Sequence, residues 1–152
     1  MKSILLITLL NFSSYNSDIS TIRELYLAAY TSESHCNSFG EKLSSTKNTS
    51  SVLIKGYKGC FYFIKCKFIK SPIDKLVYFN KGKELLESAI KEDPKSVELK
   101  FLRYTIQKNI PRFLLYHDNL ERDLNFVNVN INTINDKEVQ KFITNSLKSI
   151  EK

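Results

Sequence analysis

The sequence predicts an all-α fold of about six helices, arranged as antiparallel helical hairpins that stack into a bundle or a short superhelix. Two observations predict this fold. Only four Gly and three Pro interrupt the 152 residues, so long helices are permitted. Apolar residues also recur at helical spacing in most segments, and the segment 97–113 carries them on two opposite sides.

Residues 1–17 are predicted to be a signal peptide, and residues 18–152 a single helical domain. Lys2 precedes a short apolar run from Ile4 to Leu10, and a polar Ser/Asn-rich stretch follows, which is the order of a secretory signal. No A-x-A cleavage pattern is present, so an apolar N-terminal helix of a cytosolic protein is the alternative. The run is shorter than the roughly 20 apolar residues that span a bilayer. We expect an exported protein, periplasmic or secreted.

Two helices are expected in the first third of the domain. Ile22, Tyr26 and Ala29 recur at helical spacing after several residues that can cap a helix. A shorter helix is expected around Phe39 and Leu43, followed by a Ser/Thr/Asn-rich loop over 44–51.

The segment 51–69 is expected to form a helix that lets a second helix approach closely. Its aromatic residues and partial alternation would also suit a strand, but its length exceeds the roughly ten residues that strands reach. On a helix, small side chains lie close together, and this face is formed by Gly56, Gly59, Cys60, Phe63 and Cys66.

The clearest predicted helix follows, over 71–93. Ser71 can cap its start, Pro72 suits the first helical position, and Asp74 places negative charge in the first turn. The Asp93-Pro94 pair should end it, because the residue before a proline is disfavoured in helical geometry. One apolar stripe is expected to face the core, formed by Ile73, Leu76, Phe79, Leu86 and Ile90.

The segment 97–113 is expected to form a helix that lies in the interior of the bundle. Its apolar residues form two nearly opposite groups: Val97, Phe101 and Tyr104 on one side, and Leu99, Leu102 and Ile106 on the other. A helix on the surface needs a single stripe, so two stripes indicate neighbours on both sides. Pro111 should break this helix, one or two short helices should follow it, and the chain should close with a helix that Asn135 or Asp136 caps.

The charge of +7 and the isoelectric point near 9.3 invite an anionic partner. Lysine greatly outnumbers arginine, the residue preferred for bidentate phosphate contacts, so nucleic acid is not the partner we expect. The lysines of 55–83 spread over several helix faces, which favours solvated surface lysines over a single binding stripe.

No catalytic, cofactor-binding or metal-binding pattern stands out in the sequence. The motifs GxGxxG, GxxxxGK[ST], GxSxG and HExxH are absent, so we predict no catalytic residue, no cofactor and no enzyme activity. His117 and Glu121 would share a helix face as metal ligands can, but no second ligand pair accompanies them. Three cysteines without a CxxC pair are expected to fill the core; a disulfide would require Cys36 with Cys60 or Cys66.

One polar set on the predicted interior helix is the candidate site: Glu98, Arg103, Gln107 and Asn109. These residues form either a recognition patch at one end of the stack, or capping and ion-pair contacts that fix the register of the helices.

The chain resembles a family of small exported all-helical proteins of Bacteroidota-type bacteria over roughly residues 18–128. The residues that carry the resemblance are Tyr57-Lys58, Pro72, Lys75, Phe79, Gly82, Ala89, Asp93-Pro94, Glu98, Phe101-Leu102-Arg103, Gln107, Asn109, Pro111, Leu114, Tyr116 and Asp123. Cys60 and Cys66 stand where such proteins usually have Ala, which supports their role as fillers. The resemblance implies an exported helical protein and implies no activity.

The stretch "AIKEDPKSVELKF" also resembles the junction of two tetratricopeptide repeats, although no second copy appears at the period of about 34 residues. The sequence therefore favours a non-catalytic exported scaffold or binding module for a protein or peptide. The alternative is a basic surface that binds anionic lipid or polysaccharide.

Overall fold

The computed structural model describes residues 18–47 and 50–150, and this part of the chain contains helices and no strand. The predicted signal peptide, residues 1–17, lies outside the described residues. A first helical segment spans 18–29. It is followed by α2 (Glu33–Ser45), α3 (Val52–Lys65), α4 (Pro72–Glu92), α5 (Val97–Asn109), α6 (Leu120–Asn130) and α7 (Lys137–Ile150), with short 3₁₀ turns η1 (Arg112–Leu114) and η2 (Ile131–Thr133). The predicted all-α class is confirmed, with seven α-helices in the described residues.

Side-chain caps begin several of the helices, and those at Ser71 and Asp136 are the ones that the sequence predicts. The Ser71 hydroxyl accepts a hydrogen bond from the Asp74 amide, and Pro72 occupies the first turn of α4. Ser96 caps α5 in the same way, and the Asp136 carboxylate accepts hydrogen bonds from two amides at the start of α7. The helix α4 ends at Glu92, immediately before Asp93-Pro94.

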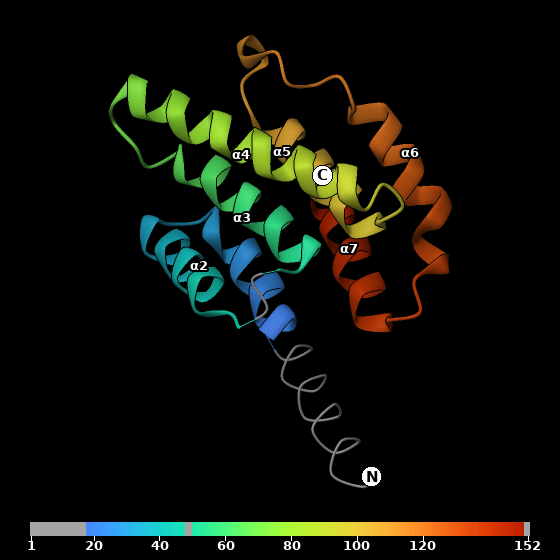
Figure 1. The fold of residues 1–152 in the computed structure, drawn as a ribbon. Helices are drawn as coiled ribbons and strands as arrows, with labels where there is room; N and C mark the ends of the chain where they lie inside the picture. The colour runs from blue at the N-terminus through green and yellow to red at the C-terminus, as the bar shows by residue number, and fades with distance from the viewer. Residues whose placement is uncertain (1–17, 48–49, 151–152) are drawn as a thin grey trace, which may run out of the picture.

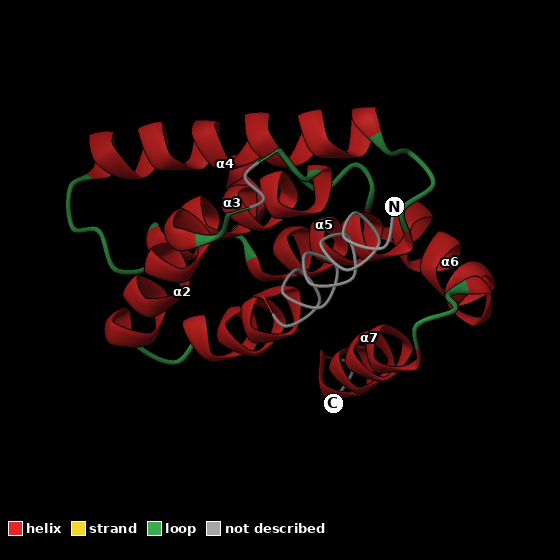
Figure 2. Ribbon diagram, turned by 60° about the horizontal axis from the view of Figure 1, so that its bottom comes forward, coloured by secondary structure: helices red, strands yellow, loops and turns green. Residues whose placement is uncertain are grey.

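The core is built around α5, which lies between α4 and α7 (Figure 2). Every residue from Val97 to Gln107 except Lys100 is buried. Leu99 is 1% exposed and Phe101 is 0% exposed, so both opposite sides of the helix are covered. On one side Leu99 approaches α3 at Gly56, and on the other Phe101 packs edge-to-face on Phe142 of α7. The predicted interior position of this helix is confirmed.

The helices α3 and α4 form the tightest pair of the bundle and lie side by side as a hairpin (Figure 1). Gly59 and Gly82 lie at the crossing, where a Cβ on Gly59 would come within 2.9 Å of the Gly82 carbonyl oxygen. Small residues on α3 therefore let the two backbones approach closely, as the sequence predicts for this face.

The predicted apolar stripe of α4 is wrong in its first half. Phe79, Leu86 and Ile90 are buried, whereas Ile73 is 77% exposed and Leu76 is 55% exposed. Tyr116 and Arg103 contact α4 at Phe79, Lys83 and Glu87, which lie beyond its first two turns. Those turns leave apolar side chains in solvent, because no further helix covers them.

Candidate functional site

Three of the four predicted site residues are buried within the bundle and face different neighbouring helices. Glu98 is 7% exposed, Arg103 is 3% exposed and Gln107 is 0% exposed, whereas Asn109 is exposed at the end of α5. They therefore do not form one patch on the surface, and each belongs to a contact between helices or within one helix.

Glu98 joins α5 to the first helical segment and to α3. Its two carboxylate oxygens accept hydrogen bonds from Nε and Nη2 of Arg23, both at 2.8 Å. The Tyr57 hydroxyl donates to Oε1 of the same carboxylate at 2.5 Å. Burial raises the pKa of Tyr57 well above its ordinary value, and the negative charge of Glu98 raises it further, so this hydroxyl remains a hydrogen-bond donor.

Arg103 joins α5 to α6 and α4. Its guanidinium holds Asp123 through Nε at 2.6 Å and Nη2 at 2.9 Å, and it donates from Nη1 to Glu87 at 2.7 Å. The Tyr116 hydroxyl donates to the other oxygen of Glu87 at 2.5 Å. Lys100 lies 3.9 Å from Asp123, so two cations and two carboxylates meet in this network. The paired charges are balanced, which is the condition for burying them.

Gln107 and Asn109 form hydrogen bonds with backbone groups near the C-terminal end of α5. The Gln107 side-chain oxygen accepts a hydrogen bond from the Asn119 amide at 3.2 Å, while its Nε2 is the one buried side-chain polar atom of the described residues without a partner. Asn109 donates to the Thr105 carbonyl one turn earlier. Both side chains therefore bind backbone groups at helix ends. This geometry agrees with the hypothesis that these polar residues cap helices.

The partners of Glu98 and Arg103 could not be found by sequence reasoning. Arg23 lies 75 residues from Glu98, and Asp123 lies 20 residues from Arg103. Asp123 is fully buried against Arg103. Among the described residues, no group of three or more His, Cys, Asp or Glu side chains is placed to hold a metal ion.

The three cysteines are unpaired. Cys36 and Cys60 are buried in the core, and burial raises the pKa of both thiols above the ordinary value. Cys66 is partly exposed; burial raises its pKa to about 11, and its thiol donates to the Tyr62 carbonyl. These are the properties of apolar fillers and not of nucleophiles.

Cysteine labelling should therefore be slow in the folded protein. At pH 8 the Cys66 thiolate should be about a hundredfold scarcer than that of an ordinary cysteine, since its pKa is raised to about 11 from 9.0. The rate of iodoacetamide labelling, followed by mass spectrometry, should rise steadily between pH 8 and pH 10. Unfolding in guanidinium should restore ordinary rates for all three thiols. Rapid labelling of one folded thiol at pH 7 would contradict this expectation.

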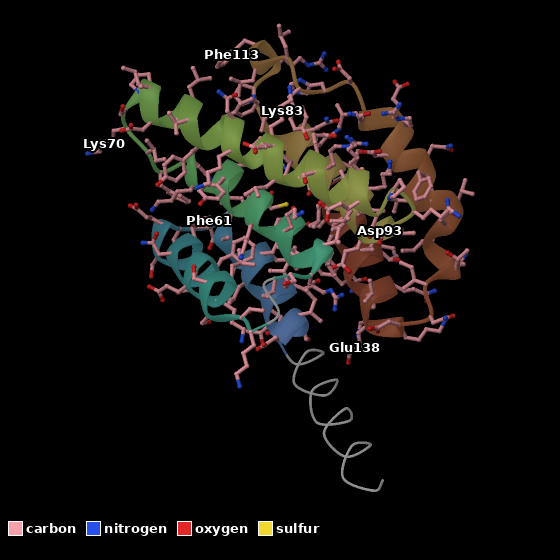
Figure 3. The ribbon with its side chains drawn as sticks, viewed as in Figure 1. Phe61, Lys70, Lys83, Asp93, Phe113 and Glu138 are labelled. Carbon is pink, nitrogen blue, oxygen red and sulfur yellow. The ribbon has the colours of Figure 1, made fainter. Side chains whose placement is uncertain are left out.

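Several large apolar side chains in a different part of the molecule are exposed to solvent. Ile73, Leu76 and Val77 on the first turns of α4 are 77%, 55% and 57% exposed. Phe113 and Leu115, in and beside η1, are 78% and 81% exposed. We call these five residues the α4 apolar surface. Figure 3 shows Phe113 at the outer edge of the molecule, on the same side as Lys83 of α4.

The two parts of the α4 apolar surface lie on the same side of the molecule, because Tyr116 ties the chain after η1 to the middle of α4 (Figure 3). The Tyr116 ring stacks on Phe63, packs edge-to-face on Phe79 and receives Lys83 on its face, with Nζ 5.1 Å from the ring centre. Leu76 precedes Lys83 by seven residues, which is two helical turns, so it lies on the same side of α4 as the Tyr116 contacts.

The fold and these contacts define an all-helical bundle with a buried, internally paired polar network and one exposed apolar surface. A comparison with protein-family models, with curated proteins and with solved structures found no match. Within the described residues, no helix is both long enough and apolar enough to cross a membrane.

Proposed function

We propose that the protein is an exported, non-catalytic helical scaffold that binds a partner through the α4 apolar surface. The observation that carries this proposal is the exposure of five large apolar side chains in two segments on the same side of the molecule. Scattered single apolar residues are normal on a protein surface, but grouped ones mark interaction sites. The other exposed large apolar side chains of the described residues are Leu27, at 47%, and Val129, at 68%, and they lie on other helices.

The rest of the bundle supports a scaffold. Arg23 pairs with Glu98 and Arg103 pairs with Asp123, and these two ion pairs join the first helical segment and α6 to α5. A catalytic site needs polar groups that face a bound substrate, and these groups face each other instead. The scaffold therefore holds α4 and η1 in fixed relative positions, as a binding surface requires.

Site-specific photo-crosslinking in the producing cells tests this proposal. A photoreactive amino acid replaces Leu76 on the α4 apolar surface, which is 55% exposed, or, as a control, Val129 on α6, which is 68% exposed. Irradiation should give discrete adducts, with protein or with lipid, from position 76 and none from position 129, because only the first lies at the contact. Equal adduct patterns from both positions, or none from either, would refute a binding role for this surface.

Export is the second part of the proposal, and it depends on the sequence from Lys2 to Leu10. Mass spectrometry of the protein recovered outside the cytoplasm should give a chain that begins near residue 18. Recovery of only the full-length chain from the cytoplasm would overturn the proposed export. The crosslinking result does not depend on export.

A further inference from the structure

We infer that the partner of the α4 apolar surface is an anionic lipid bilayer, to which the protein binds peripherally, with Phe113 and Leu115 inserted among the lipids and lysines of α4 on the headgroups. This inference rests on the proposed binding role of the surface and adds the chemistry of its partner. Three observations carry it: unpaired lysines, their position around the apolar side chains, and the way the apolar side chains project.

The lysines near the α4 apolar surface are not neutralised by the protein. Residues 67–84 contain five lysines and two acidic residues, Asp74 and Glu84. In the described residues none of the lysines at 70, 75, 81 and 83 forms an ion pair with a carboxylate. Elsewhere the lysines at 42, 55 and 65 are each paired with an acidic side chain. An anionic partner therefore complements this side of the molecule.

The lysines border the apolar strip on α4. At 100° per residue, Leu76, Ile73 and Val77 cover about 100° of the helix, which is the width of an amphipathic face. Lys83 lies beside one edge of this strip and Lys81 beside the other. Lys70 extends outward from the end of the molecule where α4 begins (Figure 3). An apolar strip between lysines is the arrangement found in elements that lie in the interface of an anionic membrane.

Most of these apolar side chains project from the molecule, and Leu115 borders a shallow surface hollow beside Asp118 and Glu121. Phe113 and Leu115 are 78% and 81% exposed, and Leu114 between them packs against the core. Leu115 also adopts a left-handed backbone conformation, with φ at 49°, which disfavours a bulky residue. The fold itself would be served better by glycine at this position, since the Leu115 side chain covers nothing. A large apolar side chain held there is explained by a contact outside the molecule.

Other anionic partners fit these observations less well. An acidic polysaccharide would engage the lysines but would leave Phe113, Leu115 and Ile73 in water. An acidic amphipathic helix would need a concave seat, whereas these side chains protrude by more than half of their area. A bilayer accepts both the projecting apolar groups and the charges around them.

Vesicle sedimentation with the full chain tests the inference. The protein should sediment with vesicles of phosphatidylglycerol and phosphatidylcholine at about 0.15 M salt, and much less with phosphatidylcholine alone. The triple variant Lys70→Gln, Lys81→Gln, Lys83→Gln should weaken binding about a hundredfold, at about fivefold per lysine. Its matched control is Lys137→Gln, Lys141→Gln, Lys148→Gln on α7, which has the same net charge and should bind like wild type. All variants share residues 1–17, so that segment cannot cause a difference between them.

The apolar half of the contact is tested by Leu115→Gly and Phe113→Ser. Each should weaken binding to the anionic vesicles by about tenfold or more, since an apolar side chain no longer leaves water. Leu115→Gly should leave the melting temperature unchanged or raise it, so lost binding cannot be ascribed to unfolding. Val129→Ser and Leu27→Ser, at exposed apolar residues on other helices, should bind normally.

Two results would overturn the inference: absence of binding to anionic vesicles, or binding that the two triple lysine variants weaken equally. The crosslinking experiment then separates the two proposals. A protein adduct at position 76 without vesicle binding would support the binding surface but show that its partner is a protein and not a bilayer. Absence of both adducts and vesicle binding would reject the surface itself.

Discussion

Asp123→Ala is expected to lower the free energy of unfolding by about 3–5 kcal/mol. Asp123 is fully buried, and its carboxylate holds Arg103 through two hydrogen bonds of 2.6 and 2.9 Å. Its removal leaves the Arg103 guanidinium, which is itself 3% exposed, with Glu87 as its remaining carboxylate partner. The loss is measured by urea or guanidinium denaturation followed by circular dichroism.

Two comparisons show whether this cost comes from an uncompensated buried charge. Lys55→Ala removes an ion pair with Glu92 that is largely in solvent, and it should change stability by less than about 1 kcal/mol. The double variant Arg103→Met, Asp123→Leu removes both charges and should be more stable than Asp123→Ala alone. If the double variant were as unstable as the sum of the two single variants, the two residues would contribute independently and the explanation would be wrong.

Gly59→Ala is expected to cost about 1–3 kcal/mol of unfolding free energy, even though alanine favours helices more than glycine does. A Cβ at this position would lie 2.8 Å from the Leu86 amide nitrogen and 2.9 Å from the Gly82 carbonyl oxygen. Both are backbone atoms of α4, so the clash is relieved only if the two helices separate. Thermal or denaturant unfolding measures the loss.

Gly40→Ala is the matched control for this variant. Its Cβ would meet the edge of the Phe61 ring, at 2.6 Å from Cε2, and this partly exposed side chain can turn away. The gain in helix propensity then offsets the adjustment, so stability should stay within about 1 kcal/mol of wild type. If Gly59→Ala were no less stable than Gly40→Ala, close helix contact would not be the function of Gly59.

The elements that the sequence predicts correctly are those that depend on local chemistry. Ser71 and Asp136 cap helices as predicted, because a side-chain oxygen near a free amide is sufficient for the contact. The two apolar sides of 97–109 predict burial on both, since no other environment suits Leu99 and Phe101 together. The small residues of α3 likewise predict the close approach of α4.

The features that the sequence does not predict depend on which helices meet. Ile73 and Leu76 continue the apolar stripe of α4, but periodicity does not say how far along α4 its neighbours extend. The polar set on α5 is a candidate from sequence because Glu98 and Arg103 stand in an apolar helix. Their partners Arg23 and Asp123 are distant in sequence and are chosen by the packing of the bundle. The α4 apolar surface is therefore visible only once the covered part of α4 is known.

The central position of α5 has a consequence for how the chain is made. Its neighbours come from both directions along the sequence: Arg23 reaches Glu98 from 75 residues before it, and Phe142 covers Phe101 from α7, with α6 in between. During synthesis, the side of α5 that bears Phe101 must therefore stay uncovered until α7 has left the ribosome. During that interval the nascent chain exposes one apolar side of its central helix, and a chaperone would bind there.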